Sequence, residues 1–227
     1  MEFLEAIDVH ADALKRAALT AGPSAPVRNC PKWTVHDLVR HVAWVHCFAV
    51  ATALNTSAEP APPDDWDELL GWWDGQRLAM REALSQPPET PARSPFPGVA
   101  VSVGDWTRRM AHEAAIHRLD AESALDPRPA TKYSPAFAAD GVDEYLTFLV
   151  PQRSPRYEKA GIIHFTTPGR TWALRLAPGE HARPVPPGTP DAELRGDADD
   201  VYRALWGRAH HAEVSGDPAL LAPLAAP

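Results

Sequence analysis

The chain has 227 residues, which is enough for one large domain or two small ones. Hydrophobic residues make up 44% of it and suffice for an ordinary buried core, but no run approaches the roughly 18 apolar residues that a membrane span needs. The net charge of −8, from 22 basic and 30 acidic residues, disfavours nonspecific binding to nucleic acid or to an anionic membrane, although a local basic pocket for an acidic substrate stays possible.

The N-terminus has no signal-peptide pattern, because Glu2 and Glu5 make it acidic, and we therefore expect a cytoplasmic protein. The two cysteines, Cys30 and Cys47, are in neither a metal-knuckle nor a redox spacing. We expect both to be reduced and structural. If the protein performs thiol chemistry, the thiol is expected to come from a cofactor.

The first predicted helix covers about residues 2–20, where apolar side chains alternate with charges. The second runs from about Thr34 to Thr56. Thr34 fits an N-cap and Asp37 follows three residues later, which makes a capping box with Asp in place of Glu or Gln.

His41 lies on the apolar side of this second helix. Leu38, Val42 and Val45 form an apolar stripe at helical spacing, and His41 falls among them, so its imidazole should point toward the core. Such a histidine is most often a hydrogen-bonded core residue. It becomes a candidate metal ligand when a second core helix also turns polar groups inward.

A third helix covers about residues 65–86, after a proline-rich loop. Residues 91–104 then contain a short β-rich run and form either one wall of a site or a plain surface connection. We expect Asp105 to cap a fourth helix at about 106–124.

The fourth helix carries the most informative pair of the chain. Glu113 and His117 are four residues apart, so their side chains lie on one face, one turn apart. They can share one divalent metal, or they can form a plain solvated pair. The zinc-protease motif is excluded, because His112 and His117 are five residues apart and diverge by roughly 140°.

Two helices of one bundle would supply His41, Glu113 and His117 to a single ion. Three protein ligands with an open position are typical of a catalytic metal site, whereas a structural site normally has four. We find no convincing fourth ligand in the sequence. Zinc suits two imidazoles and one carboxylate best, and nickel, manganese and iron are the alternatives.

A fifth helix is expected over about residues 135–150, where Pro151 closes it. The pattern changes from about residue 158, so we predict a helical domain at 1–150, a linker at 151–157 and a small α/β domain at 158–227. The expected elements of this second domain are a hairpin of strands 161–167 and 171–176, further strands near Val185 and at 192–195, and a helix at 197–206 that Gly207 ends.

Three segments together resemble the mycothiol-dependent maleylpyruvate isomerase family of actinobacteria, a branch of the DinB-like metalloenzyme superfamily. The first reads Cys-Pro-x-Trp-Thr-Val-x-Asp-Leu-Val-x-His and ends at His41. The second reads Arg-x-x-x-Glu-x-x-x-His-Arg-x-Asp-Ala-Glu from Arg109, and the third is Leu-Trp-Gly-Arg, which ends at Arg208. The resemblance covers most of the chain. It implies an α+β fold, with an N-terminal DinB-like up-down helical bundle and a small sterol-carrier-like α/β domain.

The resemblance also implies a site and a chemistry. The metal ligands of the family fall on His41, Glu113 and His117, and its active-site arginine falls on Arg208. Arg208 would bind a substrate carboxylate, or it is only a cation at a helix end. The implied cofactors are a divalent metal and mycothiol, whose thiolate adds to the double bond of maleylpyruvate, allows rotation and leaves as fumarylpyruvate forms. The same thiolate could instead be transferred to another small electrophile, acidic or neutral.

Two rival functions stay open at this stage. The protein could be a non-catalytic binder of a small molecule or lipid, or its metal could be structural. Some polar residues also have two interpretations: Asp120 either orients His117 or pairs with Arg118 at the surface, and His210 and His211 either line a cleft or form a polar turn. We expect the other helical histidines to be exposed or structural; these are His36, His46 and His112.

Overall fold

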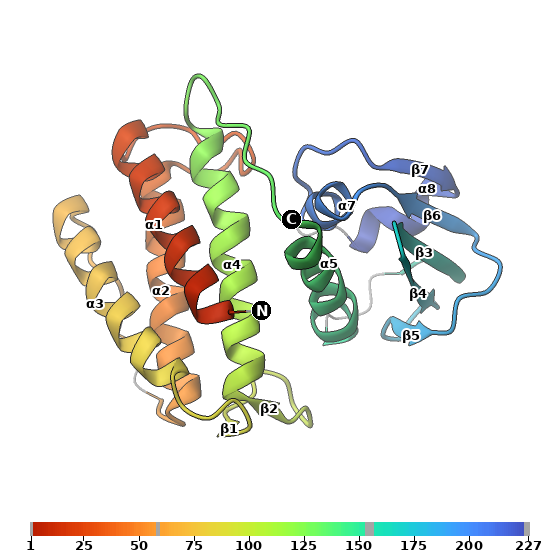
Figure 1. Cartoon of the computed structure of the whole chain (residues 1–227), viewed down its shortest axis with the longest axis horizontal. Helices are drawn as coiled ribbons and strands as arrows, with labels where there is room; N and C mark the ends of the chain where they lie inside the picture. Colours follow the sequence, from red (N-terminus) through yellow and green to blue (C-terminus); the bar gives the residue numbers. More distant parts are fainter. Residues whose placement is uncertain (1, 58–59, 153–156, 225–227) are drawn as a thin grey trace. The chain divides into compact units, whose positions relative to one another are not determined.

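The computed structural model describes residues 2–57, 60–152 and 157–224. The chain divides into two compact units, Met1–Thr131 and Lys132–Pro227. The first unit is helical and the second contains a five-stranded sheet (Figure 1), so the predicted α+β class is confirmed. None of the described helices is long and apolar enough to cross a membrane.

Four long helices build the first unit. They are α1 (Phe3–Ala21), α2 (Val35–Ala53), α3 (Trp66–Leu84) and α4 (Val103–Ser123). In Figure 1, α1 lies beside α4 and α3 lies beside α2. Residues 91–104, predicted as a connection with a β-rich run, contain the two-residue strands β1 (Pro91–Ala92) and β2 (Val101–Ser102), which pair in an antiparallel ladder just before α4.

The directions of the helices depart from a simple up-down alternation. His36, near the start of α2, bonds to the carbonyl of Asp64 and contacts Trp66 at the start of α3. Farther along both helices, His46 contacts Trp73. The helices α2 and α3 therefore run in the same direction, and the up-down order holds for α1 and α2 but not for α2 and α3.

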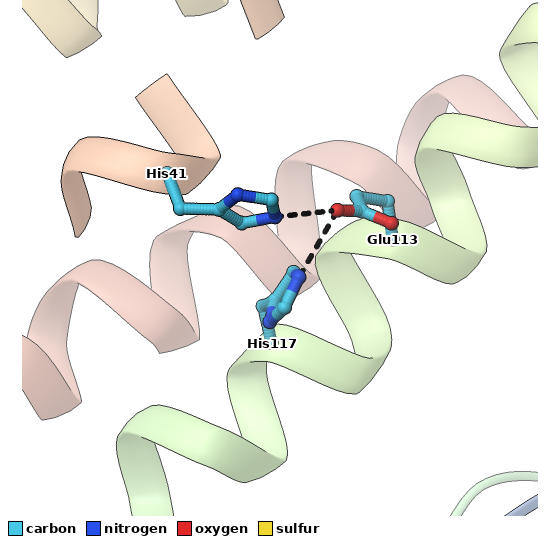
Figure 2. Close-up of side chains that lie close together, drawn as sticks. All are labelled: His41, Glu113 and His117. Atoms are coloured by element: carbon cyan, nitrogen blue, oxygen red, sulfur yellow. Dashed lines mark hydrogen bonds and ion pairs between the residues drawn. The ribbon is translucent and has the colours of Figure 1, made fainter. Parts of the chain in front are cut away.

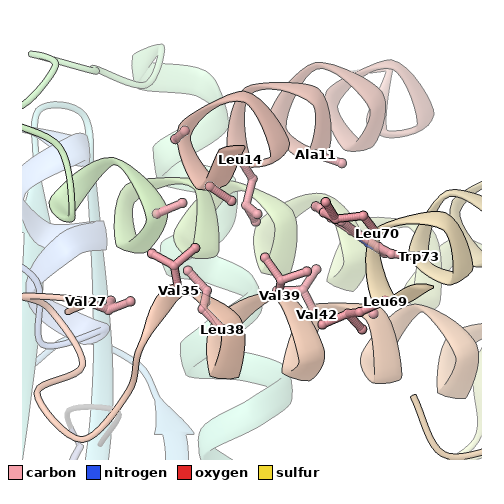
Figure 3. Packing of buried hydrophobic residues seen from close by; sticks show 14 residues of the cluster. Ala11, Leu14, Val27, Val35, Leu38, Val39, Val42, Leu69, Leu70 and Trp73 are labelled. Atoms are coloured by element: carbon pink, nitrogen blue, oxygen red, sulfur yellow. The ribbon is translucent and has the colours of Figure 1, made fainter. Parts of the chain in front are cut away.

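The core of this bundle lies between the helices, where buried side chains of α1, α2 and α3 pack against one another (Figure 3). Leu14 of α1, Trp73 of α3 and Leu38 and Val42 of α2 are completely buried. Leu38 and Val42 of the stripe predicted on α2 thus face the core, because residues three and four apart share one face of a helix, whereas Val45 is only half-buried. His41, one residue before Val42, lies at the edge of this face and keeps partial exposure.

Both helices that carry the candidate ligands begin with a capping box. The Thr34 hydroxyl accepts the backbone N–H of Asp37 and the Asp37 carboxylate accepts that of Thr34, which confirms the prediction for α2. At the start of α4, Ser102 and Asp105 make the same pair of bonds. The prediction of Asp105 as N-cap is wrong. Ser102 is the N-cap, and Asp105 is the N3 residue whose carboxylate accepts the backbone N–H of Ser102.

The second unit begins with a helix that changes type along its length. It consists of α5 (Pro135–Glu144), the π-helical turn η1 (Tyr145–Leu149) and α6 (Val150–Gln152). The sequence predicted that Pro151 closes this helix at residue 150, but the helix continues through Pro151 to Gln152. The N–H of Val150 bonds to the carbonyl of Tyr145, so the widened turn accommodates a proline that would clash in a regular α-helix.

The predicted domain boundary lies at residue 150, whereas the division between the two units falls at residue 131. Helix α5 packs against α7 (Ala198–Leu205), which belongs to the second unit. Of the predicted linker 151–157, residues 153–156 lie outside the described part of the chain.

The sheet of the second unit has the strand order β5-β4-β3-β6-β7. The predicted hairpin is confirmed, with β3 and β4 antiparallel, and β6 lies parallel to β3 on its other side. The strands are β3 (Gly161–Thr167), β4 (Arg170–Leu176), β5 (Arg183–Val185), β6 (Ala192–Arg195) and β7 (Glu213–Gly216). Two short helical pieces follow, α8 (Pro218–Leu221) and η2 (Ala222–Leu224).

Helix α7 ends as the sequence predicts. Gly207 has a positive φ of 65°, which a glycine adopts without steric cost. The N–H of Gly207 bonds to the carbonyl of Ala204, and the N–H of Arg208 bonds to that of Arg203. These two bonds form a Schellman motif, so Arg208 is the first residue directed away from the helix.

Candidate metal centre

His41, Glu113 and His117 converge at one point of the first unit (Figure 2). His41 projects from α2, and the other two project from neighbouring turns of α4. One oxygen of Glu113, Oε1, lies 3.3 Å from Nε2 of His41 and 3.0 Å from Nε2 of His117. The ligand atoms of all three side chains lie within 4.8 Å of one another. The structure therefore brings together the three residues that the sequence analysis selected.

The three side chains differ in their access to solvent. The side chain of His41 is 33% exposed, whereas those of Glu113 and His117 are 11% and 9% exposed. Trp33 covers part of the cluster, with its ring centroid 5.0 Å from that of His41 and 6.3 Å from that of His117. A ligand therefore reaches the centre from the side of His41.

Asp120 orients the imidazole of His117. Its Oδ2 lies 2.9 Å from Nδ1 of His117, and its side chain is completely buried. Asn29 donates from Nδ2 to the other oxygen of Asp120 at 3.1 Å. A carboxylate at Nδ1 favours the tautomer with the proton on Nδ1, which leaves the lone pair of Nε2 directed at the cluster. The surface-pair alternative for Asp120 is not observed, since Arg118 pairs with Glu122 at 2.7 Å instead.

Arg109 performs the equivalent task for Glu113. Its Nη2 donates to Oε2 of Glu113 at 2.5 Å, and the arginine is 7% exposed. The guanidinium thereby occupies one carboxylate oxygen and leaves Oε1 facing the two histidines. No role of Arg109 was predicted from the sequence. Its position four residues before Glu113 was the available signal, because that spacing places both side chains on one face.

The electrostatics of the cluster favour a bound positive charge. Burial by itself raises the pKa of Glu113, but the charge of His117 and the hydrogen bonds from both histidines hold this pKa well below its usual value. Burial lowers the pKa of His117, whereas the charge of Glu113 and the hydrogen bond of Asp120 raise it to about 9. Near neutral pH His117 is therefore protonated in the metal-free protein, and its Nε2 directs a proton at Oε1 of Glu113.

The donor set fits a divalent cation. Two imidazole nitrogens and one carboxylate oxygen are ligands that zinc and neighbouring transition metals accept. Within the described residues this is the only group of three or more His, Cys, Asp or Glu side chains arranged to hold a metal ion. Asp120 is not a fourth member, because its carboxylate is turned to Nδ1, the far side of the His117 ring.

The remaining candidate residues lie elsewhere. Arg208, in the second unit, is buried and donates from Nη1 to the carbonyl of Trp206, and its role in substrate binding stays a prediction. His210 and His211 are exposed, as residues of a polar surface turn are, and His210 also lines an apolar pocket of the second unit. Of the helical histidines, His46 and His112 are completely buried. Cys30 and Cys47 form no disulfide.

Comparisons with known proteins give concordant results for both parts of the chain. The family model described as "Mycothiol maleylpyruvate isomerase N-terminal domain" matches residues 3–122, and the "MDMPI C-terminal domain" model matches residues 136–223. A sequence search of curated proteins finds no match.

Two crystal structures of the mycothiol-dependent maleylpyruvate isomerase are similar to this chain. The first, of a histidine-to-alanine mutant, has a TM-score of 0.65 at 12% identity, and the second has a TM-score of 0.58 at 13% identity. Each similarity covers 94% of this chain and 92% of the other. At these identities the likeness is one of fold.

Proposed function

Because the chain belongs to the mycothiol maleylpyruvate isomerase family, we propose that it is a thiol-dependent metalloenzyme. Its cofactors are mycothiol and a divalent metal, with zinc preferred and nickel, manganese or iron as alternatives. The substrate is a small electrophile, and the reaction is either a cis–trans isomerisation of the maleylpyruvate type or an S-transfer. The convergence of His41, Glu113 and His117, open on one side, is the observation that carries this proposal.

The chain's own residues hold and orient the metal ligands. When bound, the metal lowers the pKa of a thiol, so that a nucleophilic thiolate is present near neutral pH. Arg109 fixes which oxygen of Glu113 faces the centre, and Asp120 fixes the ring of His117. Residues held in this way lose little further freedom when a ligand binds, which favours tight and specific binding.

The isomerisation needs no further reagent. The thiolate sulfur forms a bond to one carbon of the double bond. The π electron pair of the double bond then moves onto the neighbouring carbonyl group. The remaining single bond rotates, the electron pair returns, and the carbon–sulfur bond breaks. The thiolate is regenerated without gain or loss of protons or electrons. In an S-transfer, the carbon–sulfur bond persists in the product: the displaced group leaves with the electron pair of the bond that breaks, or, when an epoxide opens, the alkoxide takes up the proton that the thiol had lost.

The carrier alternative has weaker support. The second unit has an apolar pocket of about 250 Å³ that Phe165, Leu194 and Leu205 help to line. Pockets for drug-sized ligands are roughly 300–1,000 Å³, so this one is small for a lipid. The enzyme proposal also includes a cytoplasmic location, with which two cysteines outside any disulfide agree.

Metal analysis of the purified protein, followed by an assay of mycothiol-dependent turnover of maleylpyruvate and of a panel of electrophiles, tests the proposal. His117→Ala should remove both the metal and the turnover. His36→Ala is the matched control, since His36 bonds to the carbonyl of Asp64 and lies outside the cluster. Full turnover by metal-free protein would refute the proposal.

A further inference from the structure

A pocket of about 580 Å³ opens beside the metal centre, and all of its lining belongs to the first unit. Its lining residues are Lys32, Trp33, Asp37, Arg40, His41, Trp44 and Pro62. His41 is the one candidate metal ligand in this lining, and it is also the most exposed of the three. The pocket is therefore the space through which a substrate reaches the centre.

The charged groups of this pocket are not equally available to a ligand. Arg40 forms an ion pair with Asp64. The carboxylate of Asp37 accepts hydrogen bonds from the backbone N–H and the hydroxyl of Thr34. Lys32 is exposed, and among the residues that the structure describes no acidic side chain pairs with it. The pocket thus offers one uncommitted ammonium group.

Two indole rings supply the apolar part of the pocket. Trp33 packs on His41 at a centroid distance of 5.0 Å, and Trp44 stacks on Phe48 at 5.5 Å with an interplanar angle of 21°. Trp44 remains 39% exposed, although large aromatic side chains are usually well buried. A planar, unsaturated ligand with one negative end would match these walls and the Lys32 ammonium together.

We propose that Lys32 binds the carboxylate of the electrophile and makes the enzyme prefer anionic substrates to neutral ones. The inference rests on the proposed function and names the substrate class of that site. A local cation matters here because the chain as a whole has a net charge of −8, which repels anions at long range. Lys32 acts on binding and not on the bond-making steps, since the metal ligands belong to other side chains.

Steady-state kinetics with variants of Lys32 test this proposal. Lys32→Met should raise the KM for maleylpyruvate about tenfold, as expected for loss of one charge-assisted hydrogen bond. The same substitution should leave kcat, the metal content and the KM for an uncharged electrophile such as monobromobimane nearly unchanged. Lys32→Arg should restore a KM near that of the unchanged protein, and Lys159→Met, at a lysine paired with Asp217, is the control. An equal loss with charged and neutral electrophiles, or a higher KM for mycothiol alone, would overturn the assignment.

A binding measurement separates failure of this proposal from failure of the proposed function. The tryptophan fluorescence of the metal-loaded protein can be titrated with fumarate, without any turnover. The part of the fluorescence change that is lost in Trp44→Phe comes from the pocket. The dissociation constant should rise about tenfold in Lys32→Met. If turnover is absent and this shift is present, the enzyme proposal fails and the anion site stands. An unchanged dissociation constant refutes the role of Lys32.

Discussion

Metal binding to the three-residue centre should release a proton from His117. Glu113 and Asp120 raise the pKa of this histidine to about 9 in the metal-free protein, against the lowering effect of burial. Below that pH the metal has to displace the proton. The apparent dissociation constant should therefore fall about tenfold for each pH unit up to about 9 and then become constant. At pH 7 the competition weakens binding about a hundredfold, or ~2.7 kcal/mol.

Competition with a chromophoric zinc chelator between pH 6 and 10 would measure this dependence. Calorimetry in two buffers of different ionisation enthalpy would count the protons, and we expect about one released per metal at pH 7. The chelator's own protonation must be included in the analysis. An affinity that does not change between pH 6.5 and 9 would refute the assignment of the proton to the cluster.

The variant Asp120→Asn sharpens this test. It removes a negative charge that raises the pKa of His117, so the level region of the curve should begin at a lower pH. Above pH 9, where proton competition has ended, affinity should be about 10–100-fold weaker, because the partner of the imidazole is less basic. Asp105→Asn is the control: it alters a capping carboxylate on the same helix and should leave the metal affinity unchanged.

Three further predictions follow from the same contacts. The metal-free protein should lose stability as the pH rises from 6.5 to about 9, because folded His117 still binds a proton that the unfolded chain has released. Thermal melting across this pH range should show a decline in Tm that is absent in the metal-loaded protein. Glu113→Gln should abolish stoichiometric metal binding in elemental analysis, since it removes the only negatively charged ligand of the set, the carboxylate that also pairs with Arg109; a full complement of metal would contradict the ligand set. Ser102→Ala should cost about 1 kcal/mol in denaturant unfolding without changing the metal content, because it removes only the cap of α4.

The candidate centre was predictable from the sequence because helical spacing is local. Glu113 and His117 share a face whenever their segment is helical, and the stripe of Leu38 and Val42 determines which side of α2 is buried. The supporting residues were less accessible. Arg109 has the spacing of an ordinary surface pair with Glu113, and spacing within one helix does not reveal that this arginine is buried.

The wrong or missed elements have local causes as well. Asp105 and Ser102 are both good N-caps, and the choice between them depends on where the short β2 strand ends. Strand β7 was not predicted because all four of its residues are exposed, so no alternation marks it. Pro151 follows a long helical pattern and so predicts a helix end, and the sequence does not reveal the π-turn before it that lets the helix continue.

Asn29 gives the loop between α1 and α2 a direct connection to the metal centre. Its side chain donates to Asp120 and to the carbonyl of Leu119, and its N–H donates to Ser123, all near the end of α4. The same loop carries Trp33, which covers the cluster. An ion that tightens His117 against Asp120 would consequently also order the loop that carries Trp33. Because such coupling is reciprocal, ordering of this loop would strengthen ion binding by the same free energy with which the ion stabilises the ordered loop.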